Sequence, residues 1–235
     1  MEKLQFSTGE ILGQAWQIFK QRWSQLLGIG VLYMVLSSIA TSLPALFQSE
    51  DSQAATLGAS LIAQILSLFL SIGMTKIVLA VVRQQEVAIA DMFAGGKYLL
   101  QYFLGSLVVG IITFVGFLLL IVPGIIWSLK YMFVLYLIID EELDFSKAMK
   151  ESEQMTNGIK GQLMLFGLAM VGVNLLGMIP LFLGLLITIP VTSLASFVLY
   201  DVLRKKYKAA IGGEVAQPIA TDTTVEAPSE VQPGV

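Results

Sequence analysis

The sequence contains no cysteine and no histidine, and only 13% of its 235 residues are charged. Without cysteine, the chain can form neither disulfides nor thiolate metal ligands. Without histidine, it lacks the commonest general base and the commonest transition-metal ligand. Soluble domains carry about 25% charged residues, so this composition argues against a water-soluble fold. It also argues against most enzyme chemistries in membranes. We therefore expect no catalytic residue, no metal and no cofactor.

Long uncharged stretches separate the few charged residues. They cover residues 23–49, 52–75, 98–129 and 161–200, and hydrophobic residues make up 56% of the chain. A helix needs about 20 apolar residues to cross the hydrocarbon core of a bilayer. The sequence therefore predicts an all-α fold, a polytopic membrane bundle of six transmembrane helices. We place these spans at about residues 25–47, 55–80, 99–121, 125–139, 161–179 and 184–203.

Proline and glycine mark where the two longest apolar regions reverse direction. Residues 98–139 contain one charge and would form a helix about 63 Å long, roughly twice the thickness of the hydrocarbon core. Because proline and glycine both interrupt helices, we place one turn at Pro123 and Gly124. By the same reasoning, the turn between spans five and six begins at Pro180. Pro190 is expected to kink span six, which membrane helices tolerate.

Basic residues occur in alternate connections only. They precede span one, follow spans two and four, and follow span six, whereas the other connections contain no lysine or arginine. Such asymmetry is the positive-inside pattern. It predicts a multi-pass protein of the cell (inner) membrane, the plasma membrane of a bacterium, with both termini in the cytoplasm.

Three further segments are predicted around the spans. Residues 1–24 contain an amphipathic interfacial helix, begun by a capping box of Ser7 and Glu10, before the membrane domain of residues 25–208. A second interfacial helix follows Asp144 and ends near Gly158, which suits a helix C-terminus. Residues 209–235 have too little apolar surface to fold, and we expect a disordered tail.

Several short motifs resemble a known family. They are Val122-Pro123-Gly124-Ile125-Ile126, Lys130-Tyr131, Asp140-Glu141, Ala148, Ser152, Gly158, Lys160, Thr188-Ile189-Pro190 and Tyr200. Over roughly residues 5–208, the chain resembles a bacterial family of six-span integral membrane proteins of unknown function. That family is similar to the membrane domain of some glycerophosphoryl diester phosphodiesterases. The resemblance implies a fold and a location. It implies no catalysis, because the soluble phosphodiesterase domain is absent from this sequence.

Lys130 is the most unusual residue of the predicted spans. It lies about midway between the turn at Pro123 and Asp140, and so near the membrane centre. A lysine there costs roughly 2.5–3.5 kcal/mol on insertion scales. Two interpretations stay open. Lys130 contacts an anion such as a lipid phosphate or a substrate carboxylate, or it extends its ammonium to the interface from a short span.

Span two carries a polar stripe at helical spacing. Its members are Ser60, Gln64, Ser67, Ser71 and Thr75. The stripe either lines a hydrated path or forms hydrogen bonds and close packing between helices, and the second reading is favoured. The same choice applies to Asn174 in span five. An acidic cluster of Asp140, Glu141, Glu142 and Asp144 lacks the loop pattern of a Ca²⁺ site and is interpreted as a solvated boundary.

Two functional classes follow from these features. The first is a non-catalytic membrane module that binds lipid or a partner protein and supports assembly or regulation. The alternative is a small transporter of an anionic or amphipathic solute, with Lys130 and the stripe facing one cavity. The expected partners are membrane lipids and another membrane protein or a second copy of the chain. Nucleic acid is not among them, because the chain has no basic domain and no reader motif.

Overall fold

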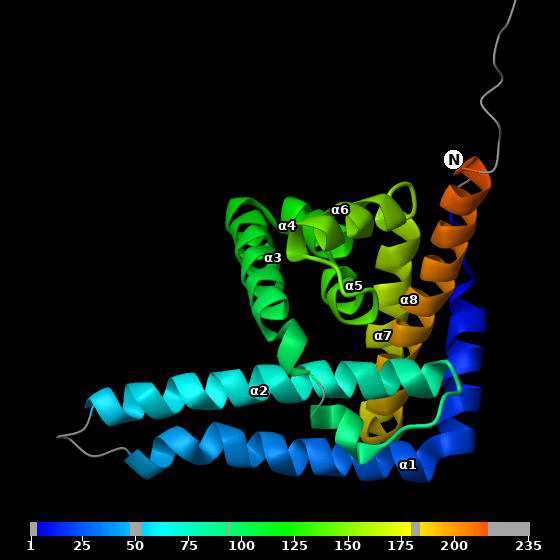
Figure 1. Ribbon diagram of the computed structural model, residues 1–235. Helices are drawn as coiled ribbons and strands as arrows, with labels where there is room; N and C mark the ends of the chain where they lie inside the picture. Colours follow the sequence, from blue (N-terminus) through cyan, green and yellow to red (C-terminus); the bar gives the residue numbers. More distant parts are fainter. Residues whose placement is uncertain (1–3, 48–52, 94, 180–183, 216–235) are drawn as a thin grey trace, which may run out of the picture.

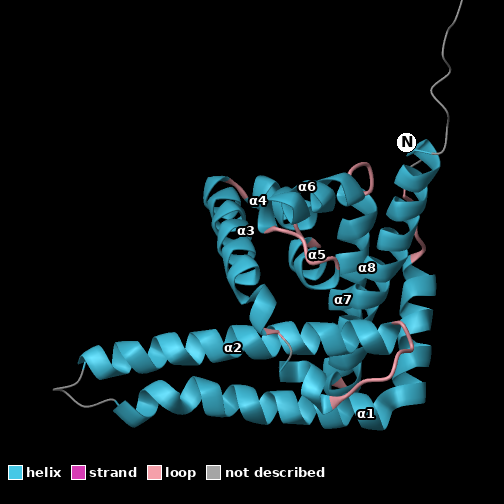
Figure 2. Ribbon diagram, viewed as in Figure 1, coloured by secondary structure: helices cyan, strands magenta, loops and turns pink. Residues whose placement is uncertain are grey.

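The computed structural model describes the chain except for residues 1–3, 48–52, 94, 180–183 and 216–235 (Figure 1). Every regular element of this part is a helix (Figure 2). The α-helices are α1 (Thr8–Ser42), α2 (Gln53–Val82), α3 (Leu99–Leu119), α4 (Ile121–Lys130), α5 (Val134–Asp140), α6 (Phe145–Thr156), α7 (Lys160–Met178) and α8 (Leu185–Val215). Three short 3₁₀ helices are η1 (Leu43–Phe47), η2 (Ile89–Phe93) and η3 (Gly96–Tyr98).

Six helical segments within the described ranges are long and apolar enough to cross a membrane, which confirms the all-α fold class. They are Thr8–Phe47, Gln53–Val82, Ala90–Leu119, Ile121–Asp140, Lys160–Met178 and Leu185–Ile211. Large apolar side chains cover the outside of these segments, and many are more than half exposed. A surface of this kind suits contact with lipid tails. The chain is thus a multi-pass membrane protein by the length and composition of its helices.

The first helix continues from the predicted interfacial segment into the first span. α1 begins at the predicted cap, where the Ser7 hydroxyl accepts a hydrogen bond from the Glu10 N–H. It bends at Arg22, whose backbone leaves the helical region. The Arg22 guanidinium donates to the carbonyl of Gln85, 2.9 Å away, and this contact holds the bend beside the end of α2. The interfacial part and the span are therefore one bent helix.

The reversal between spans three and four lies before the predicted turn. The chain turns at Leu120, which has extended backbone angles, and α4 begins at Ile121. Pro123 thus lies in the first turn of α4, where a missing N–H breaks no helical hydrogen bond. Gly124 serves close packing, because a Cβ there would lie 2.7 Å from Cδ1 of Phe117. The prediction that Pro123 and Gly124 form the turn was wrong, although both lie beside it.

The predicted fourth span is two helices. Residues 131–133 interrupt it between α4 and α5. At the break, the buried Ser152 hydroxyl of α6 donates to the Lys130 carbonyl at 2.8 Å and accepts from the Phe133 N–H at 3.3 Å. A side chain from another helix thereby satisfies backbone groups that the interruption exposes. The two remaining turn residues differ in outcome. Pro190 lies inside a continuous α8, and Pro180 lies outside the described residues. The predicted start of the tail at residue 209 was wrong, because α8 continues to Val215. The rest of the predicted tail lies outside the described residues.

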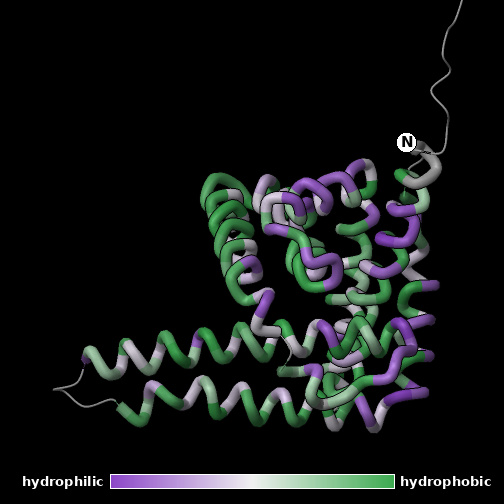
Figure 3. The backbone as a smooth tube through the Cα atoms, viewed as in Figure 1, coloured by the Kyte–Doolittle hydropathy of each residue, from purple (hydrophilic) through white to green (hydrophobic). Residues whose placement is uncertain are grey.

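The helices form hairpins that extend from a shared core. After its bend, α1 pairs with α2 in a hairpin that runs along the lower edge of Figure 1. The first part of α1 lies beside α8, and both run across the direction of the hairpin, as does α3. The largest buried cluster draws on α1, α2, α5, α6, α7 and α8. The ring of the buried Tyr200 stacks on that of the partly buried Tyr136, with centroids 5.2 Å apart. Hydrophilic segments gather on α6, the later part of α8 and the bend of α1, away from the hairpin tips (Figure 3).

Candidate functional site

Charged side chains from two helix ends and from the interior of a third helix meet beside the core. Arg83 follows the last turn of α2, Asp140 ends α5, and Asp201 lies in α8. The Arg83 guanidinium donates to both carboxylate oxygens of Asp140, at 2.5 and 2.7 Å, and to Asp201 at 2.9 Å. The Tyr200 hydroxyl donates to Asp140 at 2.8 Å. One guanidinium therefore ties α2 to both α5 and α8.

A second group of ion pairs adjoins the first, one turn further along α8. Arg204 contacts Glu141 at 3.2 Å and Glu151 of α6 at 2.6 Å. Two lysines complete the arrangement: Lys208 contacts Glu141 at 2.5 Å, and Lys205 contacts Asp201 at 2.6 Å. We call the whole set the ionic cluster. It consists of Arg83, Asp140, Glu141, Glu151, Tyr200, Asp201, Arg204, Lys205 and Lys208.

The ionic cluster is internally neutral and partly buried. It combines four basic and four acidic residues, and the side chains of Asp140, Asp201 and Arg204 are only 7–8% exposed. Buried charges are expensive unless each finds an opposite charge with good geometry. Hydrogen bonds to Asp140 raise the pKa of Arg83 above its usual value. The cluster therefore satisfies its own charges and joins α2, α5, α6 and α8.

Glu141 shows how the cluster depends on pH. Burial alone would raise its pKa, but hydrogen bonds from Arg204 and Lys208 outweigh burial and hold the pKa below its usual value. A carboxylate with a lowered pKa stabilises the fold above its ordinary pKa. That contribution is present at neutral pH and is lost as the pH falls through the lowered pKa.

A peripheral ion pair attaches the start of α3 to the same region. The exposed pair Lys97 and Glu142 lies at 2.5 Å, and the Tyr98 hydroxyl donates to Glu142 at 2.9 Å. The Arg22 contact joins the basic segment before span one to the basic connection after span two. The Lys97–Glu142 pair joins that connection to the one after span four. The basic connections thus converge on one region of the molecule.

The sequence indicated only some members of the ionic cluster, and it paired none of them. The basic residues after span two, which include Arg83, entered only the topology prediction. The interpretation of Asp140 and Glu141 as a solvated boundary was wrong, because their side chains are only 7% and 22% exposed and both form ion pairs. Asp201 was not singled out. One signal was available, because Asp201 is an acid that directly follows a long uncharged run and precedes a run of basic residues. Lys205, four residues later on α8, partners one oxygen of Asp201, and Arg83 from α2 partners the other.

Lys130 has an acidic partner within the chain. It ends α4, and its ammonium lies 2.8 Å from the carboxylate of Glu153 on α6 and over the ring of Tyr131. Its side chain is 22% exposed and that of Glu153 is 52% exposed. The break after Lys130 places it beside the polar helix α6 rather than midway along one long span. The contact of Lys130 with an external anion stays a prediction. Such an anion would compete with Glu153 for the Lys130 ammonium.

Replacing Lys130 by methionine should change the free energy of unfolding by no more than about 1 kcal/mol, because half-exposed ion pairs contribute little. The hydrogen bonds at the helix break use the Lys130 carbonyl, which the substitution keeps. Thermal melting in detergent measures the effect, with Glu153→Gln as the matched control. If Lys130→Met lowers the free energy of unfolding more than Glu153→Gln does, and bound lipid is also lost, Lys130 instead holds an anion.

The predicted polar stripe lies along α2, and its hydroxyls bond mainly within the helices. Ser60 donates to the Thr56 carbonyl and Thr75 to the Ser71 carbonyl, while Ser71 also contacts the Tyr33 hydroxyl of α1 at 3.4 Å. The outer members Ser60 and Gln64 are exposed and Ser67 is half-buried. Among these contacts, the one between Ser71 and Tyr33 joins two helices, as the packing interpretation expects. Neither the stripe nor Lys130 lines the pocket that the described residues form. A cavity shared by the stripe and Lys130 therefore stays a prediction.

Asn174 forms the polar contact expected of it. Its amide N–H donates to the Thr192 hydroxyl at 3.2 Å and links α7 to α8. Its carbonyl oxygen and the hydroxyl of Thr188 are buried and have no hydrogen-bond partner among the residues described. The α7–α8 hairpin therefore holds a small polar region beside Pro190.

No group of three acidic side chains that could hold a metal ion occurs in the described part of the chain. Comparisons with protein-family models, with curated proteins and with solved structures found no match to this chain. The functional conclusions below therefore rest on the sequence and the geometry.

Proposed function

We propose that this protein is a non-catalytic membrane module that binds lipid or a partner protein and supports assembly or regulation. The observation that carries this proposal is the closed ionic cluster. Its charged groups contact one another and hold four helices in a fixed arrangement. A solute pathway needs polar groups that remain free to receive a ligand. Self-neutralised charges suit a rigid module instead.

The same proposal includes a location and a family. The basic residues gathered around the ionic cluster favour an orientation with that side in the cytoplasm, and hence both termini in the cytoplasm of a cell with an inner (plasma) membrane. The resemblance to the six-span family of unknown function, and to the phosphodiesterase-associated membrane domain, agrees with a module that supports other proteins. Membrane lipids, a second membrane protein or another copy of the chain are its proposed partners.

A small transporter is the second candidate, and one observation favours it. The unpartnered polar atoms of Asn174 and Thr188 lie within the α7–α8 hairpin, next to Pro190. Transporters place substrate sites near the membrane centre, and Asn174 and Thr188 lie within two candidate spans, Lys160–Met178 and Leu185–Ile211. A transporter would expose this region to water from one side and then from the other.

Thiol labelling distinguishes the two candidates, because the chain has no native cysteine. We expect Gln53→Cys and Lys147→Cys, both at exposed positions, to react with an impermeant maleimide from opposite sides of the membrane. Asn174→Cys should react from neither side, since a closed module keeps the hairpin interior dry. Reaction of Asn174→Cys from both sides would overturn the module in favour of a transporter, and equal labelling of the two reference positions would overturn the topology.

A further inference from the structure

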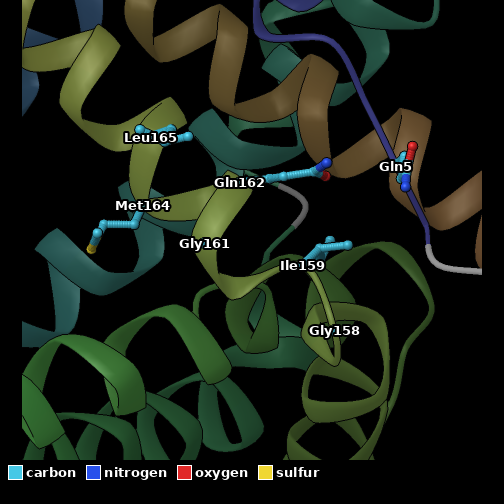
Figure 4. Close-up of a pocket in the computed structure, with 7 residues that line it drawn as sticks. All are labelled: Gln5, Gly158, Ile159, Gly161, Gln162, Met164 and Leu165. Atoms are coloured by element: carbon cyan, nitrogen blue, oxygen red, sulfur yellow. The ribbon is translucent and has the colours of Figure 1, made fainter.

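A pocket of about 530 Å³ lies where the N-terminal segment passes the start of α7. It is lined by Gln5, Gly158, Ile159, Gly161, Gln162, Met164 and Leu165 (Figure 4). Gln162 extends from α7 towards the segment that carries Gln5, and Gly158 and Ile159 form the turn below them. The turn depends on Gly158, whose φ of 78° is easily adopted only by glycine. None of its lining residues belongs to the ionic cluster.

One end of the pocket is polar and carries unsatisfied groups. The Oε1 atom of Gln162 is buried and has no hydrogen-bond partner in the described part of the chain. α7 begins without a side-chain cap, so the backbone N–H groups of its first turn can donate to a ligand. A ligand that fits this end offers acceptor oxygens to the N–H groups and a donor to Gln162.

The charge around the pocket is positive. Lys206 donates to the backbone carbonyl of Gln5, and Lys160 is the first residue of α7. Within the described ranges, neither lysine forms an ion pair, in contrast to Lys205 and Lys208 on the same helix as Lys206. No acidic residue lines the pocket. Lys206, which contacts the lining residue Gln5 and has no carboxylate partner in the described residues, favours an anionic ligand. Lys160 lies in the chain between the lining residues Ile159 and Gly161.

The other end of the pocket opens onto an apolar strip. Met164 lies at the rim, and Leu168, Val171 and Leu175 continue from it along one face of α7, with spacings of four, three and four residues. All four side chains are between 45% and 59% exposed. The strip lies within the candidate span Lys160–Met178. A ligand anchored at the polar end can therefore lay a hydrocarbon chain along α7.

We propose that this pocket binds the headgroup of an anionic glycerophospholipid, with the phosphate at the start of α7 and an acyl chain along the apolar strip. The headgroup also carries a hydroxyl that donates to Gln162, as the glycerol of phosphatidylglycerol does. This inference rests on the proposed function and names its ligand class.

Gly161 allows a direct test, because a Cβ at this position would meet no other atom within 4 Å. Leucine at position 161 therefore enters the pocket without disturbing the packing, and it suits a helix better than glycine does. Gly167 is the matched control, since it is an exposed α7 glycine with equally open surroundings and it does not line the pocket. The full-length chain, delipidated in detergent, is titrated with phosphatidylglycerol, phosphatidylcholine or inorganic phosphate and measured by native mass spectrometry.

We expect the native chain and Gly167→Leu to retain one phosphatidylglycerol at least tenfold more strongly than phosphatidylcholine. Gly161→Leu should lose this retention while melting at the same temperature or higher, and a Lys160→Gln, Lys206→Gln double variant should lose the preference for the anionic lipid. Equal retention by Gly161→Leu and Gly167→Leu would overturn the pocket as the site, while lipid binding as a function would survive. Displacement of the lipid by inorganic phosphate would assign the site to free phosphate instead. No retention by any variant would overturn the lipid-binding function as well.

Discussion

Replacing Arg83 by methionine should lower the free energy of unfolding by about 3 kcal/mol, the scale on which breaking a buried ion pair destabilises a protein. The loss is large because Asp140 and Asp201 are almost fully buried and would keep their charges without the guanidinium. Tyr200 and Lys205 would still contact the two carboxylates, which keeps the loss at the lower end of the range. Thermal and chemical unfolding in detergent measure it.

Two comparisons identify the cause of that loss. Lys97→Met removes a cation from the exposed pair with Glu142, and it should leave the free energy of unfolding almost unchanged, because solvent screens exposed ion pairs. Arg83→Lys keeps the charge but cannot reproduce the two parallel hydrogen bonds to Asp140, so it should lie between the native chain and Arg83→Met. Equal effects of Arg83→Met and Lys97→Met would contradict the view that burial makes the Arg83 contacts important.

Gly73→Ala is the second substitution with a large expected effect. Gly73 lies in α2 where η2 crosses it, and a Cβ there would lie 2.6 Å from the carbonyl carbon of Met92 and 2.7 Å from its Cα. Backbone cannot rotate away as a side chain can, and Met92 is completely buried. Overpacking of a core costs typically about 1–3 kcal/mol. We expect a loss near the upper end, measured by the same unfolding experiments.

Gly58→Ala is the control on the same helix. A Cβ at Gly58 would meet nothing within 4 Å, so alanine there should stabilise α2 by up to about 1 kcal/mol through its better helix propensity. Opposite signs for the two glycine variants would show that contact with Met92 decides the outcome. A stabilising Gly73→Ala would mean that η2 does not pack against α2 as described.

The helices were predictable because their signals are local. Apolar runs of span length indicated six membrane-crossing segments, and the Ser7 cap and Gly158 at the α6–α7 turn were predicted from neighbouring residues alone. The exact reversals were less predictable. Pro123 interrupts a helix in general but is tolerated in a first turn, so the chain reverses at Leu120 instead.

The features that depend on distant residues could not be predicted from local patterns. The break between α4 and α5 is stabilised by Ser152, which belongs to another helix. The pairing of Arg83 with Asp201 joins residues 118 positions apart. The local sequence around either residue does not indicate its partner. Lys130 was interpreted from its position in one long span, whereas the break brings it to Glu153.

The most direct measurement compares unfolding of the native chain, Arg83→Met and the triple variant Arg83→Met, Asp140→Asn, Asp201→Asn. If the buried charges of the ionic cluster serve chiefly to satisfy one another, removing all three should recover most of the stability that Arg83→Met loses, because no charge is left buried without a partner. The triple variant should also keep the bound lipid of the native chain. A triple variant that is as unstable as Arg83→Met, or that is stable but no longer retains lipid, would contradict a purely structural role for these charges.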